Sequence, residues 1–205
     1  MKVALVNPSW RFEHSIYFGC REPHLPLEFG YTRVLLEREG HEVLIADGHL
    51  LQQDEATVAQ TVCSFHPDVT VVCTAPSYLF WRCAPPELRV PREMLLALGD
   101  KCGMTVVVGP HGSVTPGAAL RKLGADVVVR GECEETIVEL VASGMTKPVS
   151  GTAVMQGDEV HLHGPVRAAQ FTNLPPLTWS DAWIQQHHHH HHRFDREPDG
   201  PGAEV

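Results

Sequence analysis

Basic side chains and long apolar runs are both scarce in this sequence. Of its 205 residues, 16 are Lys or Arg and 25 are Asp or Glu, so the net charge is −9 with His neutral. Nucleic acids and anionic membranes attract basic surfaces, and we therefore expect neither as a partner. The longest apolar runs, residues 69–75 and 104–108, have the length of a strand, whereas a membrane-spanning helix needs about 20 residues.

Cysteine motifs and a secretion leader are also absent. Six cysteines are present, but no two have the CxxC spacing of a metal or redox pair. A chain that is 43% hydrophobic and 20% charged can bury a core without a disulfide framework. The apolar stretch after Lys2 ends at Asn7 and is too short for a signal peptide. We therefore expect a cytoplasmic protein in a reducing compartment.

Strand and helix patterns alternate over the first 143 residues. Short apolar runs predict strands at residues 2–6, 42–46, 69–73, 104–108 and 126–129. Helical periods lie between them at 27–39, 54–65, 92–101 and 134–142, and a turn-rich loop at 109–117 opens onto a short helix that ends at Gly124. Continuous apolar strands separated by helices indicate an α/β fold: a doubly wound, Rossmann-like or flavodoxin-like sheet of five parallel strands.

The pattern changes after Gly144. Residues 152–155 and 159–163 flank the turn 156–158 and predict a small hairpin. The last forty residues are rich in Pro, His and Asp and resemble a linker. We divide the chain into a Rossmann-like domain at 1–145, a hairpin and connector at 146–180, and a His/Pro-rich linker at 181–205.

Four loops at the carboxyl ends of the strands are the candidate binding site, because ligands of open parallel sheets bind at that edge. The glycines of the third loop permit close backbone approach, and its helix start offers free N–H groups. The acidic residues of the fourth loop equally suit the helix dipole. The candidate residues are Pro8, Ser9 and Trp10; Thr74, Ala75, Pro76, Ser77 and Tyr78; Gly109, Pro110, His111, Gly112 and Ser113; and Arg130, Gly131 and Glu132.

An ordered set of motifs over roughly residues 1 to 180 resembles the cobalamin-binding domains that precede radical-SAM domains. The family's "GGPH" turn after the fourth strand is similar to VGPH at 108–111, and its "RGEGEET" turn to RGECEET at 130–136. Its "PLGLAYL" segment is similar to PLEFGY at 26–31, and its "LPxxP/D" connector to LPPL at 174–177. The opening VALVNP at 3–8 and EGHEV at 39–43 also match.

This resemblance implies cobalamin as the cofactor. The corrin would lie over the carboxyl edge of the sheet, with the dimethylbenzimidazole tail between strands. The small residues Ser77, Gly109, Gly112 and Ser113 would then line the tail. The aromatic residues Trp10, Tyr78 and Phe80 would flank the corrin ring.

The chain lacks the cobalt-ligand motif DxHxxG after its first strand, which mutases and methionine synthases carry. Asp47-Gly48-His49 is near that pattern but follows the second strand, and we interpret it as a solvent-facing turn. His14 and His24 are weak ligand candidates, because loop histidines are usually exposed. Cys133 replaces a family glycine and is interpreted as a tolerated small residue, and Cys83 lies in a long loop. No catalytic or metal-binding residue is assigned.

The radical-SAM motif CxxxCxxC, which holds a [4Fe-4S] cluster, is absent too. We therefore expect this chain to be a cofactor-binding domain without its catalytic partner. The resemblance implies that the full-length protein is a radical-SAM enzyme. Its radical-SAM domain, on the same polypeptide, would bind the [4Fe-4S] cluster and S-adenosylmethionine, and methyl transfer from methylcobalamin is the candidate reaction.

Two other functions stay open. The chain could be a flavodoxin-like domain that binds a nucleotide or flavin, although it has no GxGxxG after the first strand and no P-loop. It could also be a regulatory interaction module, although a receiver would have acidic residues where Asn7-Pro8 stands. Residues 187–192 are six histidines and are either a purification tag or a native His-rich linker.

Overall fold

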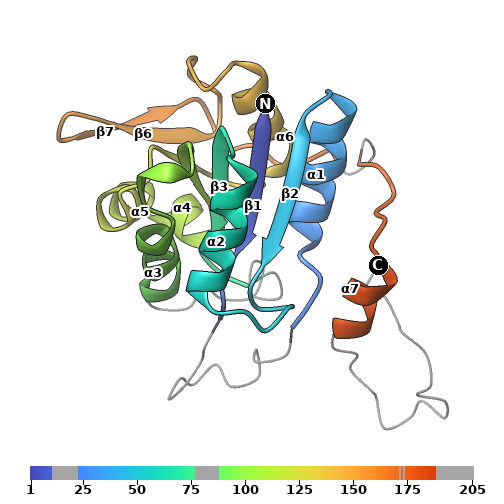
Figure 1. Cartoon of the computed structure of the whole chain (residues 1–205). Coiled ribbons are helices and arrows are strands. Elements are labelled where there is room, and N and C mark those ends of the chain that lie inside the picture. Colours follow the sequence, from blue (N-terminus) through green and yellow to red (C-terminus); the bar gives the residue numbers. More distant parts are fainter. Residues whose placement is uncertain (11–22, 77–87, 171, 173, 188–205) are drawn as a thin grey trace, which may run out of the picture.

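In the part of the chain that the structure describes, seven strands form one mixed sheet in the order β2-β1-β3-β4-β5-β6-β7 (Figure 1). A computed structural model describes residues 1–10, 23–76, 88–170, 172 and 174–187. The first five strands are parallel, and the last two are an antiparallel hairpin. The strands are β1 Lys2–Asn7, β2 Glu42–Asp47, β3 Val69–Cys73, β4 Met104–Val108, β5 Val127–Val129, β6 Thr152–Gln156 and β7 Glu159–His163.

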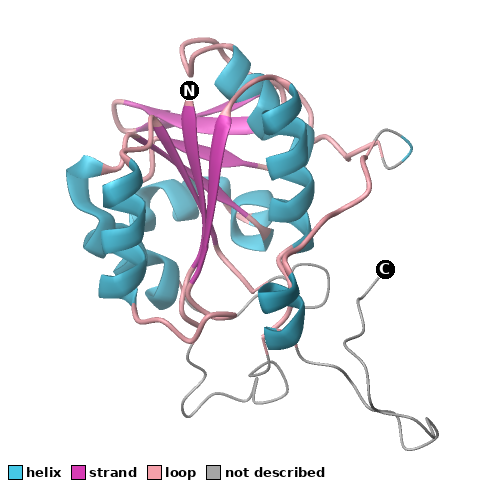
Figure 2. Ribbon diagram, turned by 45° about the vertical axis from the view of Figure 1, so that its right-hand side comes forward, coloured by secondary structure: helices cyan, strands magenta, loops and turns pink. Residues whose placement is uncertain are grey.

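Helices cover both faces of the parallel part, as the ribbon in Figure 2 shows. α1 and α6 pack on the face that carries Val3 and Leu5, whereas α2, α3 and α5 pack on the face that carries Ala4 and Val6. All five residues of β3 are buried, because both faces of this central strand are covered. The helices are α1 Leu27–Arg38, α2 Glu55–Phe65, α3 Arg89–Leu98, α4 Pro110–Val114, α5 Pro116–Leu123, α6 Glu134–Ala142 and α7 Asp181–Gln186, with a 3-10 turn at Gly99–Lys101.

The predicted doubly wound sheet and C-terminal hairpin are confirmed. The hairpin joins the parallel strands as β6 and β7, and β6 pairs with β5. Asp54 caps α2 as expected, because its carboxylate accepts a hydrogen bond from the Thr57 N–H at 2.9 Å. No helix among the described residues is long and apolar enough to cross a membrane.

The region predicted as a turn-rich loop at 109–117 is instead mostly helical. Pro110 stands at the first position of α4, where its fixed φ suits a helix start. Thr115 separates α4 from α5 with φ −133° and ψ 63°. The residue before a proline avoids the helical region, so Pro116 explains why the two helices do not merge.

The segment before and within α7 packs against α1. Trp179 stacks on Trp183 at 5.5 Å between ring centroids, and the Arg33 guanidinium lies 5.1 Å from the Trp179 ring. Arg33 Nη2 also donates a hydrogen bond to the Thr178 carbonyl at 2.5 Å. A Cβ added at Gly30 would stand 2.5 Å from Trp179 Cζ2. The absence of a side chain at Gly30 therefore permits this contact.

We expect Gly30→Ala to release residues 174–187 from α1. Alanine favours the helix by roughly 1 kcal/mol, so the domain keeps its stability while the new methyl group displaces Trp179. Hydrogen exchange of amides 178–187 should become faster. The control is Trp179→Ala, which releases the same segment; adding Gly30→Ala to it should change the exchange no further. Unchanged exchange in Gly30→Ala alone would contradict this packing.

Candidate functional site

The candidate site lies where the strand order reverses, between β1 and β3. The chain leaves β1 toward α1 on one face and leaves β3 toward α3 on the other face. At such a point the two connections diverge, which opens a crevice beyond the carboxyl ends of the strands. Asn7 ends β1 and Cys73 ends β3. The side chains of these two residues therefore form the floor of that edge.

A buried hydrogen-bond network joins the ends of three strands. Asn7 Nδ2 donates to Asp47 Oδ2 at 2.9 Å, which links β1 to β2. Asn7 Oδ1 accepts hydrogen bonds from Trp10 Nε1 at 2.7 Å and from Cys73 Sγ at 3.2 Å. Asp47 Oδ1 accepts from the Leu50 N–H at 2.7 Å. The network fixes the Trp10 ring, one of the predicted site residues, in a buried position.

Asp47 is fully buried, and burial raises the pKa of its carboxyl to about 7. Hydrogen bonds from Asn7 and from the backbone of Leu50 and His49 oppose this shift without cancelling it. The interpretation of residues 47–49 as a solvent-facing turn was therefore wrong. Asp47, Gly48, His49 and Leu50 are all buried, because the turn folds inward onto the end of β1.

Two thiols and a carboxyl lie buried beside this network. Burial is the main cause that raises the pKa of the Cys73 and Cys133 thiols well above the ordinary value, and the neighbouring Glu28 charge adds to it. Both thiols are thus protonated and not nucleophilic. Burial also raises the pKa of Glu134, which begins α6 and is 8% exposed. Its Oε2 has no hydrogen-bond partner among the described residues.

The loop after β4 brings the backbone close to its neighbours. Gly109 has φ 112° and ψ −170°, a conformation that only glycine adopts readily. A Cβ at Gly112 would be 2.7 Å from the Val129 carbonyl oxygen, so α4 sits tightly on β5. Ser113 Oγ accepts from the Gly131 N–H at 2.9 Å and donates to the Gly109 carbonyl at 3.2 Å. The Ser113 hydroxyl therefore ties the loops after β4 and β5 together.

Other predicted residues after β3 and β4 also lie at this edge. Thr74 Oγ1 donates to the Val108 carbonyl at 3.0 Å, which joins the ends of β3 and β4. Thr74, Ala75 and Pro76 are buried, and so are Pro8 and Ser9 after β1. Pro110 and His111 begin α4 and are half-buried. Ser77 and Tyr78, together with Phe80, Cys83 and His14, lie outside the described residues.

Arg130 and Glu132 hold the segment that follows the hairpin. Arg130 Nη2 donates to the carbonyls of His163 and Gly164 at 3.0 and 2.5 Å. Glu132 accepts a hydrogen bond from the Ala169 N–H through its carboxylate. Between them, Gly131 has φ 86° and pairs with Arg167, whose carbonyl oxygen would clash with a Cβ. These three predicted site residues thus anchor residues 163–169 to the end of β5.

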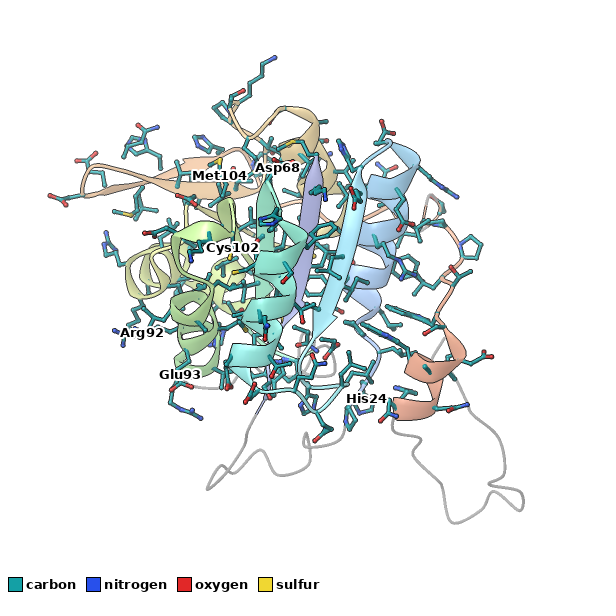
Figure 3. The ribbon with its side chains drawn as sticks, in the orientation of Figure 1. His24, Asp68, Arg92, Glu93, Cys102 and Met104 are labelled. Carbon is teal, nitrogen blue, oxygen red and sulfur yellow. The ribbon has the colours of Figure 1, made fainter. Side chains whose placement is uncertain are left out.

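Two buried histidines lie near the start of α1. His24 and His187 meet edge to face, with ring centroids 5.2 Å apart, and the Leu25 N–H donates to His187 Nδ1 at 3.2 Å. Figure 3 places His24 toward the carboxyl end of the sheet. The expectation that His24 is exposed was wrong, because the segment at 174–187 returns to α1 and covers it. The first residue of the histidine run is part of this packing.

Sequence reasoning missed several polar residues at this edge. Asn7 and Glu134 lie in the candidate loops but were not assigned to the site, Glu134 being interpreted as a complement to the helix dipole, and Cys73 was not considered. All three occupy positions where a strand ends or a helix begins. A polar residue directly after a buried apolar run was the available signal. The burial of these residues and their mutual contacts depend on neighbouring strands and could not be predicted from that signal.

The fold resembles parts of larger enzymes of known structure, whereas no family model matches the chain. The radical S-adenosylmethionine methyltransferase TsrM from Kitasatospora setae, with cobalamin and a [4Fe-4S] cluster bound, matches 80% of this chain with a TM-score of 0.61 and 22% identity. The cobalamin-dependent S-adenosylmethionine radical enzyme OxsB, with aqua-cobalamin and S-adenosylmethionine bound, matches 86% with a TM-score of 0.64 and 17% identity.

A curated relative is an uncharacterized methyltransferase of Pyrococcus horikoshii, 28% identical over 144 residues, or 69% of this chain. The chain spans 29% of that relative, 30% of TsrM and 24% of OxsB. The resemblance to cobalamin-dependent radical-SAM proteins that the sequence motifs indicated is therefore confirmed at the level of the fold. At these identities the fold is shared, and the function requires a separate argument.

The Asp47 carboxyl should make stability fall with rising pH. Its pKa is about 7 in the folded protein and about 3.9 in an unfolded chain, so folding takes up a proton between these values. The stabilising contribution is complete below about pH 4 and is lost as the pH approaches 7. We expect Asp47→Asn to flatten this slope, which is at most about 1.4 kcal/mol per pH unit.

Urea unfolding at several values between pH 4.5 and pH 7.5 measures this slope. The matched control is Asp126→Asn at an exposed carboxylate that hydrogen-bonds to Thr105, and it should keep the wild-type slope. An equal slope in Asp47→Asn and the wild type would show that Asp47 does not titrate in this range.

Proposed function

We propose that this chain binds cobalamin at the carboxyl edge of its parallel sheet, as one module of a radical-SAM enzyme. The observation that carries the proposal is the fold match over 80–86% of the chain to two enzymes whose structures hold cobalamin. The sequence motifs at 108–111 and 130–136 support it independently, because they occupy the loops after β4 and β5 at that edge.

The residues at this edge suit a large ligand rimmed with uncharged amides, which is what a corrin is. Trp10 offers a flat apolar surface whose orientation Asn7 fixes. The buried Glu134 Oε2, which has no partner among the described residues, can accept a hydrogen bond from an amide N–H. Gly109 allows the ligand to approach the backbone. When bound, cobalamin supplies a cobalt centre that can carry a methyl group.

The acidic side chains at this edge disfavour a polyphosphate ligand. Three carboxyl side chains, those of Glu28, Asp47 and Glu134, lie buried or partly buried around the reversal point. Phosphates are usually held by free backbone N–H groups or by basic side chains. Pro8, directly after β1, has no N–H to offer. A nucleotide-binding flavodoxin-like domain is therefore the weaker alternative.

The catalytic part of the proposed enzyme lies on a separate domain. We propose that residues 1–145 bind cobalamin and that residues 146–180 form a hairpin and connector. Residues 181–205 would be a linker that leads toward a radical-SAM domain of the same polypeptide. That domain would hold the [4Fe-4S] cluster and S-adenosylmethionine. Methyl transfer is the reaction we propose for the complete protein, because TsrM and the Pyrococcus relative are both described as methyltransferases. No catalytic residue is assigned to this chain.

Titration with hydroxocobalamin followed by gel filtration tests the proposal. We expect about one equivalent of corrinoid to co-elute with the protein, with a spectrum shifted toward the base-off form because the tail is buried away from cobalt. A colourless protein, both for this chain and for one extended by a radical-SAM domain, would refute cobalamin binding. Retention of flavin mononucleotide or ATP instead would favour the flavodoxin-like alternative.

The contribution of Glu134 can be measured in the same assay. Glu134→Ala removes a buried acceptor, and the loss of one hydrogen bond of about 1.4 kcal/mol corresponds to about tenfold weaker cobalamin binding. Glu135→Ala is the matched control, because Glu135 is the next residue of α6 and less buried. Equal affinities of the two variants would show that the Glu134 carboxyl does not contact the cofactor.

A further inference from the structure

A pair of thiols lies at the end of the sheet opposite the candidate site. Cys63 is in the last turn of α2, and Cys102 stands two residues before β4 begins. Their Sγ atoms are 3.5 Å apart. Both thiols point at the Leu98 carbonyl at the end of α3, from 3.9 Å for Cys63 and 3.1 Å for Cys102. One carbonyl oxygen thus holds the two sulfur atoms side by side.

The protein buries one member of the pair fully and leaves the other half-buried. The carbonyl of Cys102 accepts a hydrogen bond from Thr70 Oγ1 at 2.6 Å, and its side chain is fully buried. Cys63 is only half-buried, so small molecules can reach it. In Figure 3 Cys102 lies on the side of Asp68 and Met104, at the amino ends of β3 and β4, away from His24.

We propose that Cys63 and Cys102 form a reversible disulfide when the protein meets a peroxide. A disulfide needs the sulfur atoms at about 2.05 Å, so they must approach by about 1.5 Å from their 3.5 Å separation. The link would join α2 to the turn after α3. Both elements cover the same face of the sheet. Oxidation would therefore fix the position of α3, which follows the loop after β3.

The two thiols have different roles in this reaction. The Cys63 thiol loses its proton to water, and the thiolate attacks one peroxide oxygen; the O–O bond breaks and hydroxide leaves, taking up a proton to form water. The Cys102 sulfur then attacks the resulting Cys63 sulfenic acid. The S–S bond forms, the S–O bond breaks, and the second hydroxide leaves with the Cys102 proton as water. Two thiols and one hydrogen peroxide give one disulfide and two waters.

The order of attack follows from burial. Burial and the neighbouring Cys63 raise the pKa of the Cys102 thiol to about 12, so it is protonated at neutral pH. Peroxides react with the thiolate and not with the thiol. The half-buried Cys63 therefore takes the oxidant first, and the fully buried Cys102 resolves the sulfenic acid from the protein side.

Treatment of the chain with hydrogen peroxide tests this proposal without any cobalamin. Alkylation of the remaining thiols and peptide mass spectrometry should find Cys63 joined to Cys102. The cross-link closes a loop of about 40 residues, so the thermal unfolding midpoint should rise by on the order of 5–10 °C. Dithiothreitol should reverse both changes.

Cys63→Ser is the decisive variant, because a half-buried position tolerates the change. It should abolish the rise of the unfolding midpoint after peroxide. The Cys20→Ser and Cys83→Ser double variant is the control and should keep it; neither cysteine lies within the described residues. If Cys63 and Cys102 both remain alkylatable after peroxide, or if Cys63 reaches a sulfinic acid without the link, the proposal is wrong. Neither outcome bears on cobalamin binding.

Discussion

The carboxyl edge of the sheet depends on the hydrogen bonds of the Asn7 side-chain amide. Asn7 stands at the end of β1, which lies between β2 and β3, donates to Asp47 of β2 and accepts from Cys73 of β3 and from Trp10. A buried amide that loses one of these partners would leave a polar atom unsatisfied, which costs about 1–3 kcal/mol. Asn7 also pairs with Asp47 in the β1–β2 register. The network therefore aligns three strand ends and orients the loop that follows β1.

A second set of contacts ties the C-terminal third of the chain to the same edge. Arg130 and Glu132, directly after β5, hold the residues that follow the hairpin, and the segment at 174–187 packs on α1. The hairpin extends the sheet beyond β5, and the connector returns across the domain to His24. The residues after the hairpin are thus fastened to the parallel part of the sheet and its helices at two points.

The chemistry of the edge is that of a binding module. Its thiols are protonated by burial, burial raises the pKa of its Asp47 and Glu134 carboxyls, and its serine and threonine hydroxyls hold neighbouring loops together. Such groups position a ligand and exclude water, but they do not attack it. This agrees with the proposal that a partner domain carries the reactive chemistry. The Cys63–Cys102 pair, for which we propose a disulfide, lies at the other end of the sheet, where the link would join α2 to the turn after α3.

The sequence by itself determined the fold class and the order of the main strands and helices, and it predicts that a ligand binds at the carboxyl edge of the sheet. In runs such as 69–73 and 104–108 every residue except one threonine is apolar, and a strand of this kind is stable only between two layers of helices. The helix within 109–117 was missed, because its start depends on Pro110 and its end on Pro116, and glycines at 109 and 112 favoured a turn instead.

Only the tertiary structure decided which of the residues at that edge face one another. Asp47 is buried because Asn7, 40 residues earlier, comes to lie beside it, and Arg130 holds carbonyls more than 30 residues later. His24 is covered by a segment that begins about 150 residues downstream. The spacing of apolar residues indicates which positions of one helix or strand are buried. The contacts described here join elements that are distant in sequence. Their geometry is set by the register of the sheet and by the path of the returning chain.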